Sequence, residues 1–278
     1  MHNSSYSQNN DLTVGVLGCG WLGMPLAKKL LDLGYSVRGS RRSEQGVAFL
    51  EENGIQGYKL NVGNSEMRDQ YHFFDHLDVL CICLPPGLRK NPNSNFLQKM
   101  EILIPYLSNA KIKHILYTSS ISVYGDLTGI INETSPTEPT TQSGKQILAT
   151  EKLLLKHFHK TLTIVRLGGL IGEDRHPLHI LSKKESIPQG NSPINLIHQI
   201  DAVNALVQCI QKPFHKSIFN LVSPYHPCKE KYYTTLAKQW NIRLPRFLSS
   251  VDGAKQVSSQ LFTDQYDFKF EVEKLLID

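Results

Sequence analysis

The chain has 278 residues, 40% hydrophobic and 20% charged, a composition typical of a globular protein with one large domain or a core domain and a smaller annex. The net charge of +5 is spread along the chain with no basic stripe, and the apolar runs are strand-sized, which argues against nucleic-acid binding and against a membrane span. Residues 1–10 are polar and lack a signal-peptide core, so they predict a disordered tail on a cytoplasmic protein.

The cysteines and histidines give no indication of a metal site. Five cysteines in an odd, scattered set argue against a secreted disulfide framework. Cys81 and Cys83 lie in an apolar run and are expected to be buried strand residues, because their CxC spacing has no second cluster to complete a metal site. The eleven histidines likewise contain no third ligand at metal spacing, so we predict no metal.

Apolar, β-branched runs alternate with helical patterns through the first part of the chain. Residues 13–17 form the first expected strand, and a helix follows with Leu22, Leu26, Leu30 and Leu33 on one face. Further strands are expected at 36–40, 55–60, 79–84, 114–119 and 162–167, and long helices at about 95–107 and 143–160. Strands that alternate with helices at this spacing predict an α/β, Rossmann-like doubly wound parallel sheet.

The pattern becomes irregular after Gly168. A helix is expected at about 199–211, a strand at 218–222 and another helix at about 230–239. No flexible linker separates the two halves of the sequence. We therefore expect an NAD(P)-binding Rossmann domain at 11–167, with a smaller substrate-side region at 168–278 packed on its sheet.

A GxGxxG string lies between the first strand and the first helix, the context in which it predicts dinucleotide binding. Gly18 allows the tight turn, Gly20 lets the backbone approach a pyrophosphate, and Gly23 lets the helix pack closely. The helix N-terminus then offers free N–H groups to the phosphates. A glycine-rich turn without a ligand is the alternative. The predicted contacts are Gly18, Cys19, Gly20, Trp21, Leu22 and Gly23.

The second strand indicates which dinucleotide binds. An NAD site places an acidic residue there for the ribose 2′-hydroxyl, but this segment contains Ser40, Arg41 and Arg42 and no acid. An arginine can bind a 2′-phosphate in a bidentate way, whereas a carboxylate would repel it. We therefore expect NADP(H) in preference to NAD(H), with Arg41 as the main clamp. The alternative is that both arginines are solvated surface residues.

Further contacts are expected where the later strands end, because ligands of such sheets lie outside the carboxyl ends of the strands. Leu84 and Pro85 are expected to line the cofactor channel, with a simple strand stop by proline as the alternative. Ser119 is placed to reach the nicotinamide. On the substrate side, Arg175 and His176 are candidates to bind an anionic group, and a surface salt bridge is the alternative.

Three segments together carry a family resemblance. They are the glycine turn, residues 117–125 (Tyr-Thr-Ser-Ser-Ile-Ser-Val-Tyr-Gly) and residues 197–202 (Ile-His-Gln-Ile-Asp-Ala). They resemble the extended short-chain dehydrogenases, or NAD-dependent epimerase/dehydratase family. Within that family the chain is similar to the bacterial YeeZ-like proteins, which share the Gly-Trp-Leu-Gly-Met-Pro-Leu-Ala turn and an Arg-Leu-x-Gly-Leu run like that at 166–170. The resemblance implies a nicotinamide cofactor and catalysis by a serine, a tyrosine and a lysine.

The catalytic residues depart from the pattern that the resemblance implies. The serine is Ser120, four residues before Tyr124. When Glu151 is aligned with the glutamate that follows the family's YxxxK motif, Ser143 stands at the tyrosine and Ile147 at the lysine. The serine hydroxyl has a far higher pKa than a phenol, and isoleucine cannot lower it. Tyr124 is therefore the candidate proton donor, with packing and loop closure as its alternative role.

The sequence predicts an NAD(P)-binding, oxidoreductase-like protein of the epimerase/dehydratase type that acts on an unknown small molecule with a degenerate Tyr/Lys pair. The alternative is an NADP(H)-binding sensor or partner-binding module without turnover. We expect a small-molecule substrate and neither nucleic acid nor a membrane as partner. A homodimer is possible, since many relatives pair through helices on the sheet face.

Overall fold

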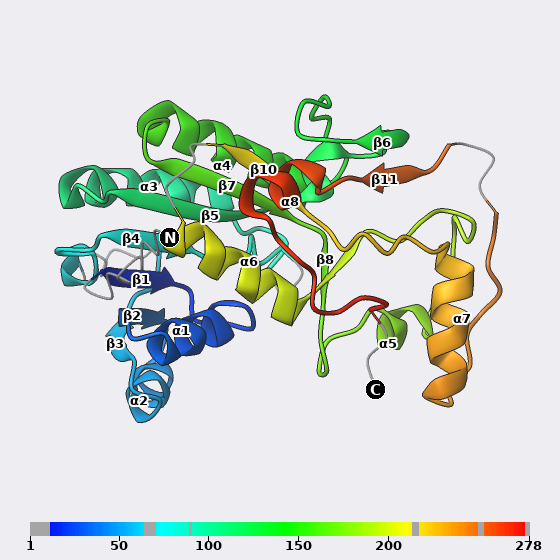
Figure 1. The fold of residues 1–278 in the computed structure, drawn as a ribbon, viewed down its shortest axis with the longest axis horizontal. Helices are drawn as coiled ribbons and strands as arrows, with labels where there is room; N and C mark the ends of the chain where they lie inside the picture. The colour runs from blue at the N-terminus through cyan, green and yellow to red at the C-terminus, as the bar shows by residue number, and fades with distance from the viewer. Residues whose placement is uncertain (1–11, 64–70, 89–90, 213–216, 250–252, 276–278) are drawn as a thin grey trace, which may run out of the picture.

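The computed structural model describes residues 12–63, 71–88, 91–212, 217–249 and 253–275, which form an α/β fold around a seven-stranded sheet (Figure 1). Its strands are β1 (Thr13–Leu17), β2 (Ser36–Arg41), β3 (Gln56–Lys59), β4 (Val79–Ile82), β5 (His114–Ser120), β7 (Leu162–Leu167) and β10 (Ile218–Leu221). The order across the sheet is β10-β7-β5-β4-β1-β2-β3, and every pairing is parallel. The order reverses direction at β1, so the predicted doubly wound Rossmann-like fold is confirmed.

The expected strands are all present, with ends that shift by one or two residues. One helix of the first half, α2 (Glu44–Glu52), was not predicted. Leu50 is its buried residue, so it lacks the apolar stripe that indicates a helix. The predicted tail at 1–10 lies outside the described residues.

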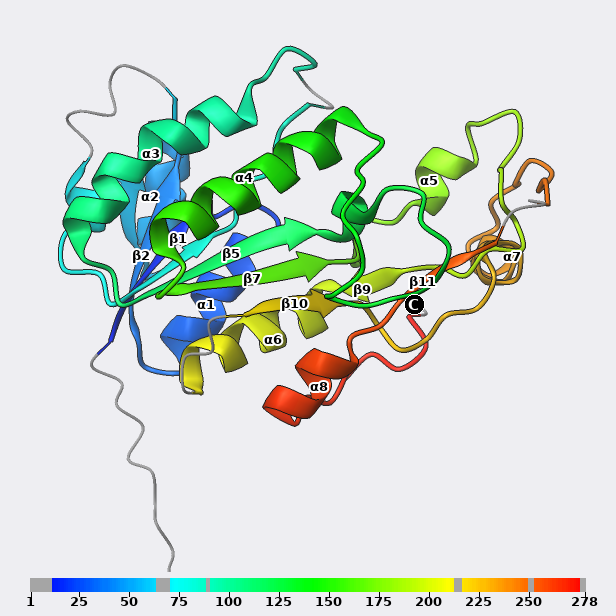
Figure 2. The ribbon, with the colours of Figure 1, turned by 90° about the horizontal axis from the view of Figure 1, so that it is seen from above.

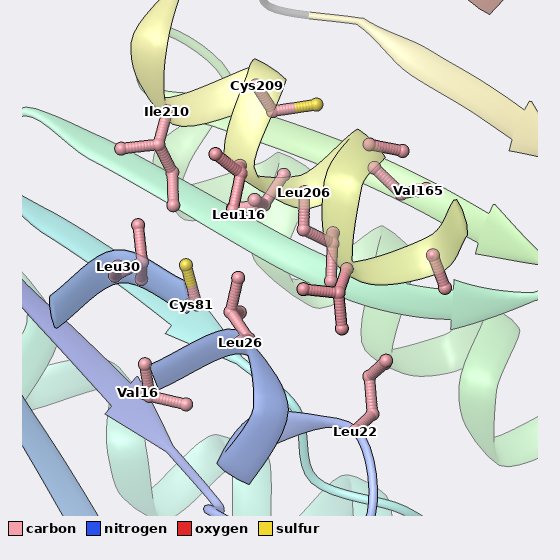
Figure 3. Close-up of a cluster of buried hydrophobic side chains, with 14 of the residues drawn as sticks. Val16, Leu22, Leu26, Leu30, Cys81, Leu116, Val165, Leu206, Cys209 and Ile210 are labelled. Carbon is pink, nitrogen blue, oxygen red and sulfur yellow. The ribbon is translucent and has the colours of Figure 1, made fainter. Parts of the chain in front are cut away.

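Helices cover both faces of the sheet (Figure 2). One face carries α3 (Phe96–Ala110) and α4 (Gln142–Phe158), and the other carries α1 (Gly23–Asp32) and α6 (Gln199–Gln211). Figure 3 shows Leu26 and Leu30 of α1 facing Leu206 and Ile210 of α6 above the strands. These leucines and isoleucine are buried, and each contributes about 1.5–3 kcal/mol relative to an exposed side chain.

Most of the remaining elements lie beyond the carboxyl ends of the strands (Figure 2). Two short sheets pair β6 (Gly129–Ile131) with β11 (Lys255–Val257) and β8 (Gly169–Ile171) with β9 (Leu196–His198). The helices of this part are α5 (Leu178–Leu181) and α7 (Lys229–Gln239), and they share a separate apolar core. The last helix, α8 (Gln260–Tyr266), instead packs on β10, beside the main sheet.

The second half of the chain therefore contributes both to the Rossmann fold and to a separate part, which we call the annex. Strand β10 is an edge strand of the main sheet and α6 packs on one face of that sheet, while α5 and α7 belong to the annex. Within the described ranges, no helix combines the length and the apolarity needed to cross a membrane.

Candidate functional site

The glycine turn joins β1 to α1 at the carboxyl edge of the sheet. Gly18 has a φ of +96°, a conformation that side chains disfavour. A Cβ on Gly23 would lie 2.2 Å from the carbonyl oxygen of Gly18, so only glycine allows α1 to begin this close to the turn. A Cβ on Gly20 would meet no atom of the described chain within 4 Å. The three glycines thus have the geometry that a diphosphate-binding turn needs.

Two hydrogen bonds from the backbone of the turn to Ser40 of β2 fix the conformation of the turn. The hydroxyl of Ser40 accepts a hydrogen bond from the N–H of Gly18 at 2.9 Å, and the Ser40 carbonyl accepts one from Cys19 at 3.0 Å. The Cys19 thiol is buried in the core, and burial raises its pKa to about 11. These groups shape the turn, and the predicted contacts of Ser40 and Cys19 with the cofactor remain predictions.

Trp21 connects the turn to the loop after β8. Its indole Nε1 donates to Asp174 at 2.6 Å, and the guanidinium of Arg175 lies 4.9 Å from its ring centroid. Leu22, next along the turn, is buried. Arg175, a predicted substrate ligand, therefore stacks against the cofactor turn. Whether it also contacts a substrate remains a prediction.

Arg41 stands at the end of β2, directly after Ser40, which holds the glycine turn. Its guanidinium lies over the ring of Phe49 at 5.7 Å, and the residue is half-buried. A half-buried guanidinium at this place can pair with a phosphate in a bidentate way. Arg42 is exposed. The arrangement fits Arg41 as the clamp better than Arg42.

The ends of β4 and β5 complete the edge. Leu84 packs on the glycine turn, since a Cβ on Gly18 would lie 2.8 Å from its Cδ2, and Pro85 is exposed. Ser119 is buried and its hydroxyl donates to Glu151 at 2.5 Å. Ser120 is half-buried, and its hydroxyl accepts a hydrogen bond from the backbone of the following 3-10 helix, η3 (Ile121–Tyr124).

A polar cluster lies buried beneath Ser120. We call Ser119, Tyr124, Glu151, Arg166 and Asn220 the buried cluster. Arg166 donates to Glu151 through Nε at 3.0 Å and Nη2 at 2.7 Å, and through Nη1 to the hydroxyl of Tyr124 at 2.9 Å. The Tyr124 hydroxyl donates in turn to Asn220 Oδ1 at 2.8 Å. The cluster joins α4, β5, β7 and β10 at one point under the edge of the sheet.

This environment bears on the predicted catalytic role of Tyr124. Its side chain is fully buried, and burial raises its pKa despite the opposing effect of Arg166. Its hydroxyl already donates one hydrogen bond and accepts another. A phenol held in this way keeps its proton at neutral pH, so the geometry favours the structural alternative, and the catalytic role stays a prediction.

Ile147, which stands where the family's YxxxK motif has its lysine, lies in an apolar environment. Ile147 is buried in a hydrophobic cluster with Val123 and Val222, where an ammonium group would lack polar partners. Ser143 lies in the first turn of α4 and is half-buried. Lys145 is exposed in a groove between the starts of α3 and α4, away from this cluster.

His176 lies in the core of the annex rather than at a free surface. Its Nδ1 accepts from the N–H of Leu178 at 3.2 Å, and its Nε2 lies 3.1 Å from the hydroxyl of Tyr232. Burial lowers its pKa to about 4. Both ring nitrogens are engaged, so the geometry favours a packing role, and the predicted substrate contact stays a prediction.

Of the two cysteines expected to be buried strand residues, Cys81 is buried in β4, whereas Cys83 lies just after the strand and is half-buried. Burial raises the pKa of both thiols, that of Cys83 to about 12, which keeps them protonated and unreactive. In the part of the chain that the structure describes, no three metal-ligating side chains come together.

Comparison with known proteins settles the family. The sequence profile described as the NAD dependent epimerase/dehydratase family matches residues 14–221. The chain belongs to this family. It is also 34% identical to Protein YeeZ of Escherichia coli strain K12 over 248 residues, which cover 87% of this chain and 89% of that protein. The resemblance stated from the sequence is therefore confirmed.

Solved structures of this family share the fold at lower identity. UDP-glucuronic acid 4-epimerase of Bacillus cereus, in complex with NAD, has a TM-score of 0.76 and 17% identity, with 94% of each chain covered. dTDP-glucose 4,6-dehydratase of Bacillus anthracis, in complex with NAD, has a TM-score of 0.76 and 12% identity, with 94% of this chain and 92% of that chain covered. These likenesses support the Rossmann-like fold alone.

Sequence reasoning missed the buried cluster, although one signal was present. The strand at 162–167 is apolar except for Thr163 and Arg166, and a guanidinium inside a buried strand needs a carboxylate partner. The partner, Glu151, lies on the preceding helix, where it had been used only to align the YxxxK motif.

Proposed function

We propose that this chain binds NADP(H) and transfers hydride between the nicotinamide and a small molecule without the family's Tyr/Lys pair. The nicotinamide, when bound, supplies the hydride donor or acceptor at the carboxyl edge of the sheet. The observation that carries the cofactor preference is the half-buried Arg41 at the end of β2, next to Ser40, which binds the backbone of the glycine turn. No acidic side chain stands at this end of β2 to favour a free 2′-hydroxyl.

The residues that would hold the dinucleotide are those at the turn. The N-terminus of α1 carries partial positive charge, and Gly20 leaves room for a diphosphate beside it. Arg41 would bind the 2′-phosphate through a charge-assisted hydrogen bond. Leu84, packed on Gly18, would bound the channel toward the later strands.

The remaining polar groups limit the proton chemistry. The start of α4 packs on η3, because a Cβ on Gly144 would lie 2.7 Å from the carbonyl oxygen of Ser122. Ser120 and Ser143 flank this contact. Their hydroxyls can orient a substrate oxygen by hydrogen bonding, but a serine does not ionise near neutral pH. The proton therefore comes from water, and we expect turnover roughly 10²–10⁴-fold slower than with a general acid in place.

The cofactor preference is tested by calorimetric titration of NADPH and NADH into the wild type and Arg41→Ala. A hydrogen bond to a charged group contributes about 1.5–3 kcal/mol, so we expect NADPH binding to weaken about tenfold or more and NADH binding to change little. Arg42→Ala is the matched control, with a smaller effect expected because Arg42 is exposed. Equal losses for both cofactors in Arg41→Ala would contradict the clamp.

A second function, an NADP(H) sensor without turnover, is favoured by two specific observations. Ile147 replaces the lysine in an apolar cluster, and the hydroxyl of Tyr124 is fully engaged. An assay of NADPH oxidation against a panel of aldehydes, ketones and nucleotide sugars separates the two functions. Slow oxidation with one of them supports the reductase, whereas tight NADPH binding without any turnover supports the sensor.

A further inference from the structure

A small cavity of about 270 Å³ is lined by the loop after η3, the segment that leads into β9, and residues of α7 and β11. One wall follows η3 and contains Gly125 and Asp126, and another contains Asn195 near the start of β9. The annex contributes Lys229 from the first turn of α7 and Lys255 from β11. Both of these elements lie beyond the carboxyl ends of the strands, as Figure 2 shows.

The cavity is linked to the ends of β5 and β7 by two segments of its wall. Gly125 directly follows η3, the 3-10 helix that begins after Ser120. The carbonyl oxygen of Asn195 accepts a hydrogen bond from the N–H of Gly169 at 2.9 Å, which ties this wall to the residues after β7. Among the described residues that line the cavity, none belongs to the glycine turn.

The charge of the lining is positive. Two ammonium groups, those of Lys229 and Lys255, face the one carboxylate of Asp126 among the residues that line the cavity. Burial and the charge of Lys255 lower the pKa of Lys229. Burial also lowers the pKa of Lys255, which the charge of Asp126 partly offsets. Half-buried ammonium groups that repel each other are stabilised by an anion bound between them.

Both lysines are held in place by their surroundings. Lys255 Nζ donates to the carbonyl oxygen of Gly125, and Lys229 Nζ donates to Gln189 Oε1 at 3.2 Å. The side chain of Asn195 fixes the β11 backbone, because its Nδ2 donates at 2.8 Å to the carbonyl of Lys255 and its Oδ1 accepts at 2.8 Å from Val257. The two ammonium groups are therefore preorganised, which lowers the entropy cost of binding.

We propose that this cavity binds the anionic group, phosphate or carboxylate, of a small substrate through Lys229 and Lys255. Ligand pockets of about 300–1,000 Å³ are usual, so a cavity of about 270 Å³ fits a molecule of a few carbon atoms better than a nucleotide sugar. The inference rests on the proposed function, since it places the substrate beside the edge at which NADP(H) would bind. It assigns to these lysines the anion-binding role predicted for Arg175 and His176.

The test is a ligand-observed NMR titration of the full chain with glycerol 3-phosphate, lactate, uncharged glycerol and UDP-glucose. We expect glycerol 3-phosphate or lactate to bind, and the two identify which anion is preferred. Glycerol is expected to show no binding, and UDP-glucose to bind more weakly than the preferred anion. Equal binding of glycerol, or tighter binding of UDP-glucose, would overturn the proposal.

Substitutions of the two lysines test whether the anion binds in this cavity. Lys229→Met and Lys255→Met are each expected to weaken binding about tenfold or more, whereas Lys255→Arg retains most of it. Lys231→Met is the matched control, because Lys231 lies on α7 but is exposed and outside the cavity. If Lys255→Met fails to fold, Lys229→Met decides the outcome. Unchanged affinity in Lys229→Met would overturn the proposal.

A phosphate probe can also bind at the glycine turn, so the same titration is repeated with Gly20→Ala, whose methyl group would occupy the space beside the turn. Unchanged probe affinity in this variant supports the cavity, and a loss equal to that of Lys229→Met contradicts it. The two proposals fail in different ways. A chain that binds NADPH but no anionic probe refutes only the cavity, whereas a lysine-dependent probe without NADPH binding refutes the proposed function.

Discussion

Replacing Glu151 by glutamine tests the buried cluster that supports the edge of the sheet. Glu151 and Arg166 are 1% and 4% exposed, and two nitrogens of the guanidinium donate to the carboxylate. Glu151→Gln would leave the arginine charge buried without its counter-ion, a change that costs about 3–5 kcal/mol. This is a large part of a typical stability of about 5–15 kcal/mol, and it corresponds to a fall in Tm of roughly 6–20 °C.

Urea unfolding followed by circular dichroism measures this loss, and a double variant provides the control. Glu151→Leu with Arg166→Met removes both charges, so it is expected to cost less than Glu151→Gln alone. If Glu151→Gln loses under about 1 kcal/mol, the pair behaves like an exposed salt bridge and the reasoning from burial is refuted. A double variant less stable than the single one would refute it equally.

Two further predictions follow from buried polar groups. Tyr124→Phe removes the partner of Arg166 Nη1 and of Asn220 Oδ1, so we expect a loss of about 1–3 kcal/mol in urea unfolding and an unchanged rate of NADPH oxidation. A rate at least 10²-fold lower at unchanged stability would instead make Tyr124 a general acid. The pKa of His176 is lowered to about 4 by burial, below the value of about 6.5 in the unfolded chain, so the unfolded state binds the extra proton and stability falls between about pH 6.5 and pH 4. His176→Asn is expected to reduce this fall relative to the exposed control His179→Asn, and equal slopes would contradict it.

The fold was predictable because its signals are local and repeated. The central strands β1, β4, β5 and β7 contain short, largely apolar runs, and each main helix except α2 carries an apolar stripe on one face. The glycine turn could also be predicted from the sequence, because the GxGxxG spacing indicates dinucleotide binding when a strand precedes it and a helix follows it. The position of Arg41 at the end of β2 was fixed by the same local pattern.

The site depends on contacts that no local pattern shows. Lys229 and Lys255 are brought together by the packing of α7 and β11, and β11 is too short to predict from its sequence. The surroundings of single polar residues are hidden for a related reason. The sequence around His176 does not show that Nε2 of its ring will lie within hydrogen-bond distance of the hydroxyl of Tyr232, 56 residues further along the chain.

The central claim is that the glycine turn binds NADP(H), and calorimetric titration of NADPH into the wild type and Gly20→Ala tests it most directly. A methyl group on Gly20 meets no atom of the described chain, so the variant is expected to keep the wild-type Tm. The methyl would occupy the space left for the diphosphate, so NADPH is expected to bind the wild type and to lose at least about tenfold in affinity for the variant. A wild type that binds neither NADPH nor NADH, or a variant that binds NADPH equally well, would contradict the claim.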